Sequence, residues 1–160
     1  METKIYTRDS LTSDIGDLIR TGLRDSDYSE AYNLCGYDPY IAVYESWIRS
    51  NQLKTVVIDG KAEGIIGTVA NTVLARDAAI WFVATDKVEE FPKTFATISR
   101  QVVNELASGY NTVYNFVDSD NKISIRWLEW LGFSVDSDPQ PLGPFKHLFH
   151  RFELRGELCA

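Results

Sequence analysis

Three β-rich segments in succession, followed by one segment of helical period, constrain the fold of this chain most. Leu53–Ile58 is apolar and β-branched, and the Asp59–Gly60 pair that closes it is typical of a tight hairpin turn. Further extended segments follow at Gly64–Leu74 and at Ala78–Thr85. Strands joined by such short turns pair with their neighbours, so we predict an antiparallel meander of three strands.

The period changes immediately after the meander. Apolar residues then recur at helical spacing, at Phe91, Phe95, Ile98, Val102 and Leu106. Gly109 ends this predicted helix, and the next segment, Thr112–Val117, is apolar on both faces, as in a central strand. Residues 80–117 are therefore predicted to form a strand–helix–strand crossover between parallel strands, which should be right-handed.

The remaining segments extend this core at both ends. The pattern predicts strands at Lys4–Thr7, Phe133–Val135 and Lys146–Leu154, helices at Ile15–Leu23, Pro39–Ser50 and Asn121–Leu131, and a loop at Pro139–Pro144. We therefore predict an α/β (α+β) fold in which residues 1–160 form a single domain. Its mixed sheet should have about seven strands, with helices on both faces.

Composition excludes several classes of function. The 160 residues include 23 Asp and Glu against 16 Lys and Arg, a net charge of −7, which argues against a broad nucleic-acid-binding surface. We expect no membrane partner, because no apolar run approaches the roughly 20 residues needed to span a bilayer, and the N-terminus does not resemble a signal peptide. Cys35 and Cys159 could form at most one disulfide. No metal is expected, because His147 and His150 should lie on opposite faces of one strand.

The segment around the last predicted helix carries a resemblance to a known family. Asn121, Ser124 three residues later, and the sequence Leu131-Gly132-Phe133 resemble the pattern of GCN5-related N-acetyltransferases (GNAT). This family binds acetyl-CoA between two central strands, and its pattern places a tyrosine, the usual general acid, where this chain has Leu128.

A second resemblance extends over nearly the whole chain. Leu23–Glu30, Trp81–Val88, Tyr110–Val117 and Ile125–Leu128 resemble the internal-virion-protein-A family, GNAT-like proteins of bacteriophages that are linked to virion assembly. The resemblance implies synthesis in the host cytoplasm during infection, a location there or in the virion, and a phage or host protein as partner. It does not by itself imply catalysis, because one fold supports many functions.

The loop that should hold the coenzyme departs from the GNAT pattern. Active enzymes use glycines there, because the pyrophosphate approaches the backbone amides closely at the start of the crossover helix. Residues 86–95 contain no glycine; Glu89 and Glu90 add negative charge, and Pro92 lacks an N–H donor. Lys87 and Lys93 could offset this by pairing with phosphate.

The resemblance nevertheless defines candidate site residues. Those that would contact acetyl-CoA are Val83, Thr85, Lys87, Lys93, Thr94 and Asn121. The candidate catalytic groups are Asp86, Tyr114 and Ser124, and Glu63 and Asp77 are further candidate bases near strand ends. A substrate or protein partner would contact Asp25, Asp27, Glu30, Arg126, Trp127 and Trp130. The alternative interpretations are a solvated turn at 25–30 and core packing of the tryptophans.

Three functions follow from these observations. The altered loop and Leu128 favour a catalytically degenerate GNAT-like protein that acts in virion assembly or host interaction through protein contacts. The alternative is an active acyl-CoA-dependent N-acyltransferase with an atypical loop. The second alternative is a host-defence antagonist or DNA-base modifier, although the charge of −7 argues against a DNA substrate.

Overall fold

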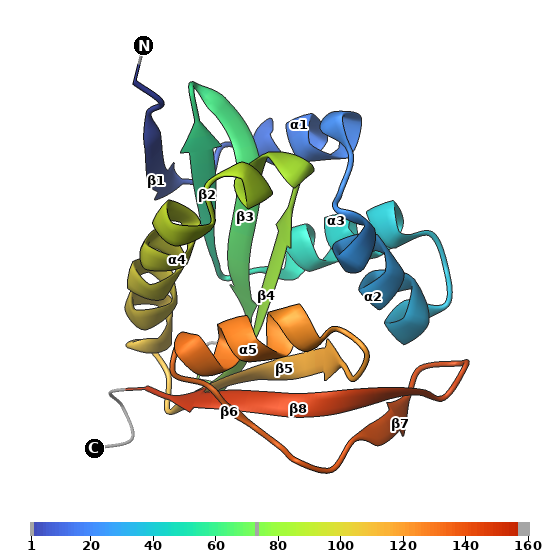
Figure 1. Cartoon of the computed structure of the whole chain (residues 1–160). Coiled ribbons are helices and arrows are strands. Elements are labelled where there is room, and N and C mark those ends of the chain that lie inside the picture. Colours follow the sequence, from blue (N-terminus) through green and yellow to red (C-terminus); the bar gives the residue numbers. More distant parts are fainter. Residues whose placement is uncertain (1, 73, 157–160) are drawn as a thin grey trace.

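The computed structural model describes residues 2–72 and 74–156, and one mixed sheet runs through this part of the chain (Figure 1). The strands are β1 (Ile5–Asp9), β2 (Gln52–Ile58), β3 (Lys61–Val69), β4 (Asp77–Ala84), β5 (Thr112–Asp118), β6 (Ser134–Val135), β7 (Gln140–Leu142) and β8 (His147–Arg155). The helices are α1 (Asp14–Thr21), α2 (Asp25–Cys35), α3 (Pro39–Arg49), the 3-10 helix η1 (Asp86–Glu90), α4 (Pro92–Ala107) and α5 (Lys122–Trp130).

The strand order is β1-β2-β3-β4-β5-β8-β6, and β7 pairs with β8 outside this path. The strands β1 to β4 pair antiparallel with their neighbours in the sheet, whereas β4 and β5 pair parallel through the crossover helix α4. The predicted α/β fold, meander and crossover are therefore confirmed. The sheet has eight described strands instead of about seven, because the proline-rich segment contains the short edge strand β7.

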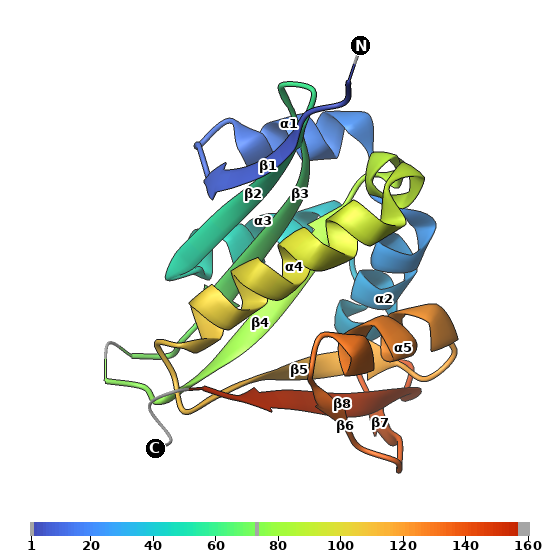
Figure 2. The same cartoon turned by 60° about the vertical axis from the view of Figure 1, so that its left-hand side comes forward.

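The helices form two layers over the sheet. Helices α4 and α5 lie on one face, and α1, α2 and α3 lie on the other, as predicted (Figures 1 and 2). Under α4 and α5 the core includes Ile80, Leu106, Val113 and Phe152. A second cluster, with Ile15, Leu18, Val43 and Ile65, is buried under α1 and α3.

The hairpin turn between β2 and β3 forms where the sequence predicts it. Asp59 and Gly60 have φ angles of 49° and 83°, the left-handed conformation that tight hairpin turns require. The end of the next strand was predicted wrongly, because β3 stops at Val69 and not at Leu74, which is 91% exposed.

Helix α2 is the one described α-helix that the sequence pattern did not predict. Its apolar side chains do not form a core-facing stripe, since Tyr28 and Tyr32 are exposed and Asp27 is the buried residue of the helix. Hydrophobic periodicity detects a helix through its buried apolar face, and α2 lacks one. The interpretation of residues 25–30 as a solvated turn is therefore wrong.

The loop between β7 and β8 packs tightly against the end of α2. Gly143 has a φ of +74°, and a Cβ atom there would lie 2.4 Å from the backbone oxygen of Asn33. Pro144 lies against Gly36, the residue that ends α2. These contacts fix α2 beside the C-terminal half of the sheet. Among the described residues, no helix is long and apolar enough to cross a membrane.

Candidate functional site

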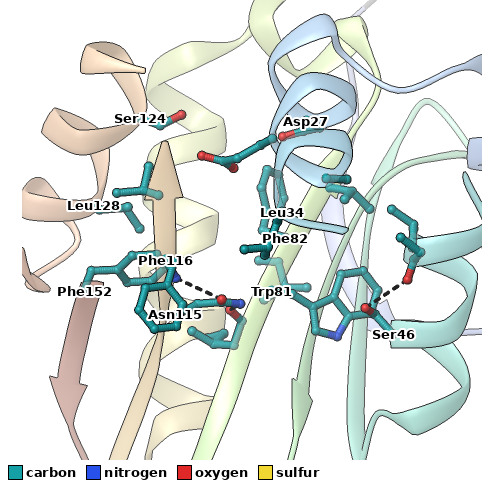
Figure 3. Close-up of a pocket in the computed structure, with 18 of the residues that line it drawn as sticks. Asp27, Leu34, Ser46, Trp81, Phe82, Asn115, Phe116, Ser124, Leu128 and Phe152 are labelled. Atoms are coloured by element: carbon teal, nitrogen blue, oxygen red, sulfur yellow. Dashed lines mark hydrogen bonds between the residues drawn. The ribbon is translucent and has the colours of Figure 1, made fainter. Parts of the chain in front are cut away.

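A cavity opens where the two central parallel strands separate. Strands β4 and β5 are paired only over Asp77–Ala79 and Thr112–Tyr114. Beyond this point the Asn115 side chain donates a hydrogen bond to the backbone oxygen of Ile80 at 2.7 Å. The cavity that follows has a volume of about 230 Å³ and is lined by β4, β5 and residues of all four helices from α2 to α5 (Figure 3).

Helix α2 spans the separated strand ends with two carboxylates. Asp27 accepts a hydrogen bond from the backbone N–H of Ala84, in β4, at 2.9 Å. One turn later Glu30 accepts one from the N–H of Asp118, in β5, at 2.7 Å. Arg24 forms a bidentate ion pair with Asp27, at 2.9 and 3.0 Å. Side chains three residues apart on one helix face thus bind both edges of the gap.

Burial changes the ionisation of both carboxylates. It raises the pKa of Glu30 to about 7, while the hydrogen bond from Asp118 N–H opposes the rise and the neighbouring Asp27 carboxylate adds to it. Burial also raises the pKa of Asp27, and the Arg24 guanidinium opposes that shift. Glu30 therefore lies in the cavity wall as a carboxyl group that exchanges its proton near neutral pH.

Three aromatic rings fill the space between α4 and α5 above the gap. Phe82 of β4 lies 5.3 Å from Phe95 of α4 and 5.5 Å from Trp127 of α5, between ring centroids. Phe95 and Trp127 are stacked, 5.8 Å apart with planes inclined by 14°. Arg24 lies 5.3 Å from the Phe82 ring on the other side. Ligand access between the two helices therefore requires movement of packed rings.

Three backbone amides in the predicted coenzyme loop already donate within the chain. Residues 86–90 form the 3-10 helix η1, in which Lys87 N–H donates to the Thr85 hydroxyl at 3.3 Å. Val88 N–H donates to the Thr85 oxygen, and Phe91 N–H to the Val88 oxygen, at 3.4 and 3.2 Å. These amides do not form an open cradle for a pyrophosphate.

The residues predicted to contact acetyl-CoA do not share one surface. Val83 lines the cavity, whereas the Lys87 ammonium lies 3.3 Å from the Glu90 carboxylate. The Thr85 hydroxyl is buried and donates to Glu63. Lys93 and Thr94 line a separate hollow together with Ile5 of β1. Asn121 caps α5, where its side chain accepts a hydrogen bond from Ser124 N–H at 3.2 Å.

Of the candidate catalytic groups, only Ser124 lines the cavity. Asp86 is exposed at the start of η1, and Tyr114 packs under the Arg151 guanidinium, 5.0 Å from its ring. The cavity residue at the tyrosine position of the GNAT pattern is the buried Leu128. The other candidate bases lie elsewhere, since Glu63 is buried under Thr85 and Asp77 is exposed at the start of β4.

The predicted partner residues fall into two groups. Asp27 and Glu30 line the cavity and Asp25 is exposed beside them. On α5, Trp127 belongs to the aromatic stack, whereas Arg126 is exposed. Trp130 is 46% exposed and stacks under the Arg100 guanidinium at 3.6 Å.

Sequence reasoning missed the residues that act across the gap, namely Arg24, Phe82, Phe95 and Asn115. The spacing of Arg24, Asp27 and Glu30 by three residues was the available signal, and it has meaning only on a helix. Both histidines lie in the last strand, β8, where His147 contacts Asp118 and His150 contacts the backbone oxygen of Asp136. Cys35 is a free thiol, and Cys159 lies outside the described residues.

The geometry defines the class of fold. Solved structures that are similar include a GNAT-family acetyltransferase from Streptococcus pneumoniae (TM-score 0.65, 11% identity, 96% of this chain and 99% of that one). A GCN5-related N-acetyltransferase from Kribbella flavida has a TM-score of 0.66 at 16% identity, covering 94% and 97%. A ribosomal L7/L12 α-N-protein acetyltransferase, solved with coenzyme A, has a TM-score of 0.70 at 9% identity, covering 98% and 96%. The chain therefore has the GNAT fold.

A more particular similarity covers the centre of the chain. Residues 63–138 match the family described as Bacteriophage T7, probable scaffold protein Gp13. This segment runs from β3 to the end of β6 and includes the crossover, η1 and α5. Among curated proteins, none is significantly similar in sequence to this chain.

Proposed function

We propose that this chain is a phage protein of the internal-virion-protein-A type that uses the GNAT fold in particle assembly, through protein contacts and without acetyl transfer. It would act in the host cytoplasm during infection and could enter the virion. The similarity of residues 63–138 to a phage scaffold family supports the assembly role. The main support for the proposed absence of acetyl transfer is the aromatic stack of Phe82, Phe95 and Trp127. These rings fill the space between α4 and α5.

Two further features support the same proposal. Leu128 has no proton to give to a leaving thiolate, and Ser124, beside it in the cavity wall, is not acidic enough to replace a tyrosine. The Lys87 and Val88 amides of η1, and the Phe91 amide that follows it, already donate within the chain. A coenzyme would have to break these interactions before its pyrophosphate could bind.

One observation favours the alternative of an active N-acyltransferase. Glu30 lies in the cavity wall with its pKa raised to about 7, which suits a general base for an amine acceptor. The test must therefore decide whether acetyl-CoA binds at all.

Calorimetry with acetyl-CoA provides that test. A site with a dissociation constant of about 10 µM would add on the order of 2.7 kcal/mol of stability at about 1 mM ligand. We expect the melting temperature of this chain to stay unchanged at that concentration. A rise in melting temperature that increases with the acetyl-CoA concentration would overturn the proposal and support the enzyme.

The assembly role is tested by complementation of a phage that lacks the gene for this chain. Ser124→Ala and Asp86→Ala remove catalytic candidates and should leave the yield of infectious particles unchanged. Arg126→Ala and Trp130→Ala remove side chains exposed on α5 and should reduce that yield about tenfold or more if they anchor a partner. Arg20→Ala, exposed on α1, is the matched control for Arg126→Ala. A normal yield without any copy of the chain would contradict the role.

A further inference from the structure

Three side chains of kinds that bind metal ions lie together at the end of β5, next to Glu30. The chain passes from Asp118 through Ser119 to Asp120, and His147 begins β8 opposite them. His147 Nε2 lies 2.8 Å from an Asp118 carboxylate oxygen and 3.8 Å from one of Asp120. One ligand atom from each of the three residues lies within 4.8 Å of the other two.

Three hydrogen bonds from backbone amides hold the turn that carries Asp118 and Asp120. Ser119 N–H donates to the Leu148 backbone oxygen at 3.0 Å, which fixes the turn after β5 against β8. Asp118 N–H donates to the Glu30 carboxylate at 2.7 Å. Asp120 N–H donates to the Asp118 carboxylate at 2.9 Å, which orients that group as well. The three candidate ligands are therefore already gathered before any ion binds.

The charges at this site are unbalanced. Among the residues that the structure describes, His147 is the only basic side chain with a nitrogen within 4 Å of a carboxylate oxygen of Asp118 or Asp120. One imidazole cannot balance two carboxylates, and the carboxyl group of Glu30 accepts a hydrogen bond from the Asp118 N–H beside them. A divalent cation would neutralise both aspartates and accept the lone pair of the imidazole nitrogen.

The donor set distinguishes among cations. Calcium and magnesium select oxygen ligands, whereas imidazole together with carboxylate suits zinc and its neighbours in the first transition series. Zinc bonds of about 2.1 Å in tetrahedral geometry separate ligand atoms by about 3.4 Å, and the observed 2.8 and 3.8 Å bracket that distance. The Asp120 side chain is 85% exposed, so water can reach the remaining coordination position.

We propose that Asp118, Asp120 and His147 form a binding site for a divalent transition-metal ion, with zinc as the best match. The ion would join the end of β5 to the start of β8, next to the cavity. The site does not depend on the proposed function, since its ligands are not residues of the acetyltransferase pattern. The sequence could not indicate it, because the two ligand segments are 27 residues apart, at Asp120 and His147, with only one histidine involved.

Titration calorimetry of the full chain, stripped of metal with a chelator and then dialysed, tests the proposal with zinc chloride as the probe. We expect one zinc ion per chain with a dissociation constant in the micromolar range. His147→Ala and Asp118→Asn should each weaken binding by about 100-fold or more, since loss of a group that only orients a ligand already costs about 10–100-fold. Asp118→Asn keeps the oxygen that accepts the Asp120 N–H, so it should fold normally.

The chain offers a matched control in its second histidine. His150→Ala should bind zinc as the unmodified chain does, because His150 contacts Asp136 and not the cluster. A double Cys35→Ser and Cys159→Ser variant should also bind zinc, which excludes capture by thiols. Calcium chloride should give no binding. Failure of the unmodified chain to bind zinc at about 100 µM, or an unchanged dissociation constant in His147→Ala, would overturn the proposal.

Discussion

Replacing Trp127 with alanine is expected to lower the free energy of unfolding by about 3–5 kcal/mol, as for other large aromatic side chains in a core. The ring stacks on Phe95 and contacts Phe82, so its removal would enlarge the neighbouring cavity and leave two rings without their partner. Chemical denaturation monitored by circular dichroism measures the loss.

Two variants distinguish the contribution of the aromatic stack to stability from the general cost of removing a tryptophan side chain. Trp127→Phe should cost much less than Trp127→Ala, because the indole N–H is buried without a hydrogen-bond partner among the described residues and the ring contacts can persist. Trp130→Ala removes a ring that is 46% exposed and should cost about 1 kcal/mol. Equal losses for Trp127→Ala and Trp130→Ala would contradict the packing described here.

Replacing Asp14 with alanine is expected to cost about 3 kcal/mol at pH 7, since Asp14 is buried and accepts four hydrogen bonds. Arg8 donates two of them, at 2.7 and 3.0 Å, and the Thr55 hydroxyl and Leu11 N–H donate the others. Equilibrium denaturation of the two proteins gives this difference directly.

The Asp14 contribution should also depend on pH. Burial raises the pKa of Asp14, but the hydrogen bonds from Arg8, Thr55 and Leu11 outweigh it, so the pKa lies below its ordinary value of 3.8. The folded state therefore binds this proton less readily than the unfolded state. The stabilisation is complete above about pH 5 and is lost as the pH falls below 3.8 and through the lowered pKa.

Unfolding free energies from pH 7 down to pH 3 would show this dependence. The difference in unfolding free energy between the original chain and the Asp14→Ala variant should become smaller as the pH falls. Asp17→Ala, on the same helix but with a more exposed carboxylate, is the control and should have little effect. A difference in unfolding free energy that stays constant over this range would contradict the prediction, because it would show that ionisation of the carboxylate does not contribute.

The fold could be predicted from sequence where local signals and burial agree. The Asp59–Gly60 turn, the helical period from Phe91 to Leu106 and the doubly apolar Thr112–Val117 each specify one element, and all three formed as predicted. Helix α2 was not predicted, because its inward-facing contacts are made by Asp27 and Glu30. A pattern of apolar residues cannot reveal a helix whose inward contacts are made by carboxyl groups.

The candidate site was predictable in part, since Asp27, Glu30 and Ser124 were named from the sequence and line the cavity. The loop without glycine and the leucine at position 128 are visible in the sequence. The aromatic stack is not, since Phe82, Phe95 and Trp127 come from three elements whose approach depends on the tertiary fold. The same holds for His147 and Asp118, whose contact depends on the pairing of β5 with β8.

The brief pairing of β4 with β5 has a mechanical consequence. Three pairs of residues form the only strand contact between the first four strands and the remainder of the described sheet. The two parts of the sheet are therefore joined largely by contacts outside the strand pairing. Asp27 and Glu30 of α2 bind the ends of β4 and β5, and on the other face one buried cluster packs Ile80 of β4 with Val113 and Phe152 of the second part.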